Sequence, residues 1–152
     1  MKERWLPVGI LAGALFVVNV IARLVVRFAA GEDDKKQITI GLYALIAVGV
    51  VMIGVAYWWA RRYPMPRVLG DLSVAIVVAC LLSVFIGPYV SGASPFGGGL
   101  LVRQFLYFLG ISGAGAFFGL IAVMTAGQDY KSQSWKAYTE QVKAKPRKVV
   151  RR

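Results

Sequence analysis

The stretch that decides the fold is residues 38–60, ITIGLYALIAVGVVMIGVAYWWA, which contains no charged side chain. As an α-helix rising about 1.5 Å per residue, it is long enough to cross a hydrocarbon core about 30 Å thick. Aromatic residues at positions 57–59 close the stretch, and Arg61 and Arg62 follow it. Aromatic side chains gather at the headgroup level of a bilayer, and arginines concentrate on its cytoplasmic side. We therefore predict a membrane-spanning helix whose arginine-bearing end faces the cytoplasm.

Three further apolar runs have the length of a membrane span: residues 5–26, 70–89 and 100–126. The first run follows a short basic start, as in a secretory signal peptide, but it is longer than the apolar core of such a peptide and lacks a small-residue cleavage motif. We expect it to be retained as the first transmembrane helix. The predicted fold is an all-α membrane protein: a four-transmembrane-helix bundle over residues 1–127 and a basic amphipathic C-terminal tail over residues 128–152.

Prolines mark the boundaries of the third run. Before it the sequence reads ARRYPMPR, in which Pro64 and Pro66 predict a tight turn. Asp71 follows in the expected first turn of the helix, where it would cap the helix or pair with Arg67. Pro88 predicts the end of the helix or a bend in its last turn.

The distribution of basic residues predicts the orientation. With both termini in the cytoplasm, thirteen of the 18 lysines and arginines lie on the cytoplasmic side, which is the arrangement that the positive-inside rule favours. We expect a multi-pass protein of a bacterial plasma membrane. The net charge of +11 does not indicate a nucleic-acid partner, because most basic residues flank apolar runs, where they favour anionic phospholipids.

The chain has few residues with catalytic chemistry. It contains no histidine, its one cysteine (Cys80) lies within an apolar run, and the predicted spans hold no carboxylate beyond Asp71 in the first turn of the third. General acid–base and nucleophilic catalysis both need such groups in pairs, and metal sites need clusters of them. We therefore expect no enzyme activity, no cofactor and no metal.

Unusual polar residues lie near the outer ends of the first and fourth runs. Asn19, Arg23 and Arg27 are spaced four apart and share a helix face, and Arg103 and Gln104 open the fourth run. These five are the candidate site for an anionic lipid or a partner. Arg23 is either an interfacial anchor or a residue that faces the bundle, holding a carbonyl, a carboxylate or a lipid phosphate.

Glycines indicate where helices pack closely. Gly9 and Gly13 form a GxxxG pair in the first run, and Gly115 and Gly119 form another in the fourth, where Gly110 precedes them. Small residues at this spacing let helix backbones approach each other in lipid. The partner is either the chain's own bundle or another copy or subunit. If the first and fourth helices touch, the outer polar residues form one basic patch.

The tail is predicted to form a short amphipathic helix. Trp135, Tyr138 and Val142 recur at helical spacing, while Lys136 and Lys143 fall on another side. The tail carries eight basic residues against two acidic ones. We expect it to rest on the inner leaflet; docking to a cytoplasmic partner is the alternative.

Two functions fit this pattern. The favoured one is a non-catalytic accessory, assembly or scaffold subunit of a larger plasma-membrane complex, with larger membrane-protein subunits or a second copy as partners. The alternative is a small oligomeric transporter or anionic-lipid-binding protein that uses the outer arginines. A channel is disfavoured because the second run has almost no polar stripe.

Overall fold

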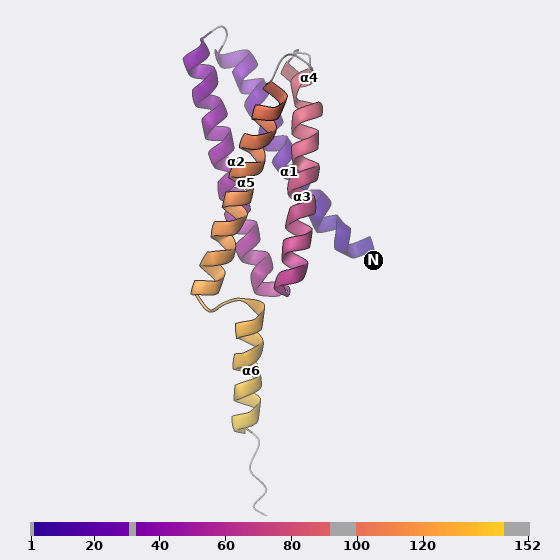
Figure 1. Ribbon diagram of the computed structural model, residues 1–152, viewed down its shortest axis with the longest axis vertical. Helices are drawn as coiled ribbons and strands as arrows, with labels where there is room; N and C mark the ends of the chain where they lie inside the picture. The colour runs from indigo at the N-terminus through magenta and orange to yellow at the C-terminus, as the bar shows by residue number, and fades with distance from the viewer. Residues whose placement is uncertain (1, 31–32, 92–99, 145–152) are drawn as a thin grey trace, which may run out of the picture.

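The computed structural model describes residues 2–30, 33–91 and 100–144, and every element in these ranges is a helix (Figure 1). Four helices are long and apolar enough to cross a membrane, which confirms the predicted four-helix bundle. Residues 145–152 of the predicted tail lie outside the described residues. The helices are α1 (Lys2–Val25), the π-helical turn η1 (Val26–Ala30), α2 (Asp34–Arg62), α3 (Met65–Phe85), α4 (Gly87–Ser91), α5 (Leu100–Thr125) and α6 (Tyr130–Ala144).

Two helix pairs build the bundle. α2 packs along α5, and α1 packs chiefly on α3. α1 is slanted relative to the other long helices, and its N-terminal end leaves the bundle to one side (Figure 1). The helix α6 continues beyond the bundle along its long axis. We call the end of the bundle that carries α4 the α4 end, and the opposite end, with the turn between α2 and α3, the α6 end.

The turn between α2 and α3 is shorter than predicted. Tyr63 ends α2, with its amide donating to the Trp59 carbonyl at 2.9 Å, and Pro64 already precedes the first residue of α3. The predicted helix start near residue 70 is therefore wrong. Pro66 falls in the first helical turn, where a backbone amide has no partner within the helix, so the proline ring is tolerated there.

The early start of α3 changes the place of Asp71. This residue lies inside the helix and is 6% exposed, and its Oδ2 atom is 3.5 Å from Nε of Arg67 one turn earlier. Of the two expected roles, the helix cap is wrong and the pairing with Arg67 is confirmed. The carboxylate of Asp71 is therefore buried in a long apolar helix, where it forms an ion pair with Arg67.

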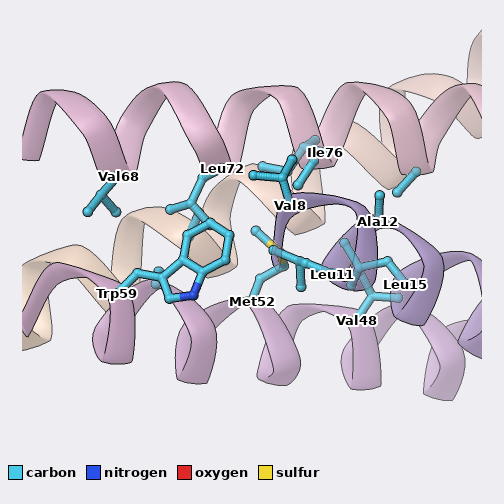
Figure 2. Packing of buried hydrophobic residues seen from close by; sticks show 14 of the residues in the cluster. Val8, Leu11, Ala12, Leu15, Val48, Met52, Trp59, Val68, Leu72 and Ile76 are labelled. Atoms are coloured by element: carbon cyan, nitrogen blue, oxygen red, sulfur yellow. The ribbon is translucent and has the colours of Figure 1, made fainter. Parts of the chain in front are cut away.

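The core lies where α1 passes α2 and α3. Figure 2 shows Leu11 and Leu15 of α1 beside Val48 and Met52 of α2. Nearer the α6 end, Trp59 of α2 extends toward α3, where further buried residues, Val68 and Leu72, lie. The outer surface of the bundle is apolar as well, as the membrane-spanning class requires, since its solvent is lipid.

A left-handed glycine separates α5 from α6. Gly127 has a φ of +58°. The amide of Gln128 donates to the Val123 carbonyl at 3.1 Å, and the amide of Gly127 donates to the Met124 carbonyl at 3.0 Å. These two bonds form a Schellman motif, which satisfies the last carbonyls of a helix and needs a left-handed residue. The motif ends α5 and directs the chain into α6.

Replacing Gly127 with alanine tests this connection. A left-handed conformation costs an L-residue with a Cβ about 1–2 kcal/mol, so we expect the amide of Gln128 to exchange with solvent about fivefold faster. Asparagine adopts this conformation more readily and should show a smaller change. Hydrogen exchange of the detergent-solubilised protein measures both variants. Equal exchange in wild type and Gly127→Ala would contradict the assignment.

Candidate functional site

An arginine clamp lies near the α4 end. Nε of Arg23 donates to Oδ1 of Asn19 at 2.9 Å, and its Nη2 donates to the backbone carbonyl of Ser83 on α3 at 3.4 Å. The sequence left open what Arg23 would hold, and the structure gives it a carbonyl of the neighbouring helix. A cation beside the last carbonyls of a helix also interacts favourably with the helix dipole.

The third span is interrupted beside this carbonyl, since α3 ends at Phe85 and α4 begins at Gly87. In an uninterrupted helix the Ser83 carbonyl would accept from residue 87 and the next carbonyl from residue 88, which is Pro88 and has no amide proton. A Cβ atom on Gly87 would lie 2.7 Å from Nε of Arg23 and 2.9 Å from its Cζ. Glycine therefore leaves the space that the guanidinium occupies.

Ser83 also contributes an unsatisfied group. Its side chain is fully buried, and its hydroxyl has no hydrogen-bond partner among the described residues. Sequence reasoning missed both Ser83 and Gly87. The available signal was Pro88, which indicates an interruption of the helix nearby, although the amide that it removes would serve the carbonyl of Val84 rather than that of Ser83.

Arg103, Gln104 and Arg27 are the other outer candidates. Arg103 is exposed, and its Nε donates to the Tyr107 hydroxyl at 3.1 Å. Its Cζ lies 5.4 Å from the centre of the Tyr107 ring. Gln104 is half-buried on the same helix, and Arg27 is exposed on η1. Because α5 packs on α2 and α3 rather than chiefly on α1, these helices do not form the single basic patch that their contact would have produced.

The glycine pairs differ in their surroundings. A Cβ on Gly115 would lie 2.6 Å from the Gly49 carbonyl oxygen, and one on Gly119 would lie 2.5 Å from that of Ile53. The backbones of α2 and α5 therefore touch at this seam. A Cβ on Gly9, Gly13 or Gly110 would meet nothing within 4 Å, so these glycines face away from other parts of the described chain.

Arginines and aromatic rings form a belt at the α6 end. The guanidinium of Arg62 lies over the Trp58 ring at 4.3 Å, and that of Arg67 lies over the Tyr63 ring at 4.3 Å. Cation–π pairs of this kind are typical of the headgroup level, where one part of a residue is apolar and the other is wet. The belt thus marks one membrane boundary of the bundle.

The helix α6 presents an uncovered apolar stripe. Trp135 and Tyr138 are each 63% exposed and Val142 is 54% exposed, and the two rings meet edge to face at 6.5 Å. Lys136 and Lys143 are exposed on another side. Because α6 extends beyond the bundle in Figure 1, the described chain does not cover this stripe.

Three hydrogen bonds hold the start of α6 to the bundle, one of which runs from Nε2 of Gln133 to the Gln128 carbonyl at 2.6 Å. The Tyr57 hydroxyl of α2 donates to Oε1 of Gln128 at 2.6 Å. Nζ of Lys136 donates to the Gly127 carbonyl at 3.3 Å. Together with the left-handed glycine, these contacts set the direction in which α6 leaves the bundle.

These features define the class of protein: a four-helix membrane-spanning bundle from which a basic amphipathic helix projects. Within the described ranges, no group of three or more His, Cys, Asp or Glu side chains is placed to hold a metal ion. No family model matches the sequence, and no curated protein or solved structure matches it either.

Proposed function

We propose that the protein is a non-catalytic accessory or scaffold subunit of a larger complex in a bacterial plasma membrane, and that α6 is its docking element. The observation that carries this proposal is the exposed stripe of Trp135, Tyr138 and Val142 on a helix that is tied to the bundle at its start. Exposed aromatic residues of this kind are the side chains that most often anchor protein interfaces.

The charge of the tail indicates the kind of partner. With both termini in the cytoplasm, α6 projects from the cytoplasmic face, and its Lys131, Lys136 and Lys143 stand against a single acid, Glu140. Like charges disfavour pairing of this helix with its own copy, whereas an acidic surface on a larger subunit is complementary. The open glycines of α1 and α5 offer a second contact, because a partner's transmembrane helix can approach closely there.

The transporter alternative has less support. It would use the outer arginines together as an anion site, but Arg23 already holds Asn19 and Ser83, and Arg103 interacts with its own Tyr107. An anion would have to compete with the contacts that connect α1 to α3.

The test is the composition of the native assembly. The protein is extracted with a mild detergent, and the mass and subunit stoichiometry of the particle that carries it are measured. We expect a larger membrane subunit in fixed proportion, lost in the variant Trp135→Ala/Tyr138→Ala. The control, Glu140→Gln, changes an exposed residue on the opposite side of α6 and should retain the partner. A particle that contains only this chain and lipid would overturn the proposal.

A further inference from the structure

A cleft lies between the start of α6 and the start of α3. Its volume is about 500 Å³. The turn between α2 and α3 provides Pro64, Met65 and Pro66, and the end of α5 provides Met124, so this side of the cleft is apolar. The opposite side is polar and belongs to the first turn of α6, with Asp129 just before it.

The cleft lies at headgroup depth. Tyr63, whose ring carries the guanidinium of Arg67, directly precedes Pro64 on the apolar side of the cleft. This arginine–aromatic belt marks the membrane boundary at the α6 end. An occupant can therefore place its polar part beside α6 while an apolar part enters the bilayer along Met65 and Met124.

The polar side carries one negative and one positive group. The carboxylate of Asp129 caps α6, because its Oδ2 accepts from the amide of Ser132 at 3.3 Å. A carboxylate has a second oxygen and further lone pairs, so Asp129 can accept other hydrogen bonds while it caps α6. The ammonium of Lys131, two residues later, makes no ion pair or hydrogen bond with the described residues, and this side chain is exposed.

The two hydroxyls of the cleft have different capacities. Ser134 Oγ donates its proton to the backbone carbonyl of Lys131 at 2.7 Å, so toward an occupant it acts as an acceptor. The phenol of Tyr130 is both a donor and an acceptor. Asp129 and Ser134 thus provide acceptors for a cation, and Lys131 and Tyr130 provide donors for a phosphate.

The geometry points to a binding site for a zwitterionic aminophospholipid of the leaflet at the α6 end. The phosphate is held by Lys131 and Tyr130, the primary ammonium by Asp129 and Ser134, and one acyl chain lies on Met65 and Met124. A headgroup with one cation and one anion matches the paired charges of the cleft. A glycerol headgroup has no ammonium and places only its negative phosphate beside Asp129. This inference does not depend on the docking role of α6, because its residues are not those of the exposed aromatic stripe.

Competition between two phospholipids tests the site. The full chain is delipidated in dodecyl maltoside and incubated with equimolar palmitoyl-oleoyl phosphatidylethanolamine and phosphatidylglycerol, and the bound lipid is counted by native mass spectrometry. We expect phosphatidylethanolamine to be preferred. Because charge-assisted hydrogen bonds are the stronger kind, Lys131→Gln should reduce its binding about tenfold.

Two further variants separate charge from helix capping. Asp129→Asn keeps the cap, since asparagine caps helices as well as aspartate does, but it removes the charge and should abolish the preference for the ethanolamine headgroup. Lys143→Gln removes the same charge as Lys131→Gln from the same helix, outside the cleft, and should bind like wild type. Equal loss in both lysine variants, or a preference that survives Asp129→Asn, would overturn the proposal.

Discussion

Replacing Gly119 with alanine should lower the free energy of unfolding by about 2 kcal/mol, and Gly115→Ala should have an effect of similar size. A Cβ on Gly119 would lie 2.5 Å from the Ile53 carbonyl oxygen and 2.9 Å from Cβ of Ala56. The nearest atom at each glycine is a backbone oxygen of α2, which cannot rotate away as a side chain does. The helices must separate, and the dispersion contacts along the seam weaken with distance.

The measurement is reversible unfolding in mixed micelles of dodecyl maltoside and dodecyl sulfate, followed by circular dichroism. Gly113→Ala is the matched control, because it lies on the same helix and a Cβ there would meet nothing within 4 Å. Since alanine favours helix over glycine by about 1 kcal/mol, the control should be neutral or slightly stabilising. Unfolding of Gly119→Ala at the same sulfate fraction as the control would contradict the close approach of α2 and α5.

Much of the fold is predictable from composition and length, because the bilayer imposes both. Each long apolar run must satisfy its own backbone hydrogen bonds in lipid, so it must be a helix of about the right span. The pairing of the helices is not predictable in the same way. The glycine pair of α1 and that of α5 look alike in the sequence, yet only Gly115 and Gly119 meet another backbone. The spacing indicates a face that permits close approach and carries no information about its partner.

The start of α3 differs from the prediction for a local reason. Pro64 and Pro66 indicate a tight turn, but a proline near the beginning of a helix removes no intrahelical bond, so Pro66 lies within α3. The same early start places Asp71 inside the helix, which rules out the cap and leaves the pairing with Arg67, the other expected role. The positions of single polar residues thus depended on a boundary that the hydropathy pattern fixes only within a few residues.

Only part of the arginine clamp is predictable from the sequence. The four-residue spacing of Asn19 and Arg23 predicts that they share a face, and their hydrogen bond follows from that spacing. The carbonyl that Arg23 also holds belongs to Ser83, sixty residues later in the chain. No local pattern places two such residues together, because their contact depends on the slant of α1 across α3.

The clamp makes a second prediction, in which Arg23→Leu and Gly87→Ala destabilise the bundle through the same contact. Arg23→Leu removes the donors to Asn19 and Ser83, and hydrogen bonds of charged groups contribute about 1.5–3 kcal/mol. Gly87→Ala places a methyl group 2.7 Å from Nε of Arg23 and displaces the guanidinium. Each single variant should therefore lose about 2 kcal/mol in the same unfolding assay.

A double-mutant cycle distinguishes this contact from two unrelated defects. In the Arg23→Leu background no guanidinium fills the space beside Gly87, so Gly87→Ala should cost nothing further there, and the coupling energy should be about 2 kcal/mol. The control Arg103→Leu removes an exposed arginine whose partner is its own Tyr107, and surface pairs of this kind contribute about 0–1 kcal/mol. Additive losses from Arg23→Leu and Gly87→Ala would mean that the guanidinium does not occupy the space beside the glycine. Non-additive losses would identify Arg23 as the residue that joins α1 to the break in the third span. They would also explain why a membrane helix has an arginine at a position where lipid contact alone would favour leucine.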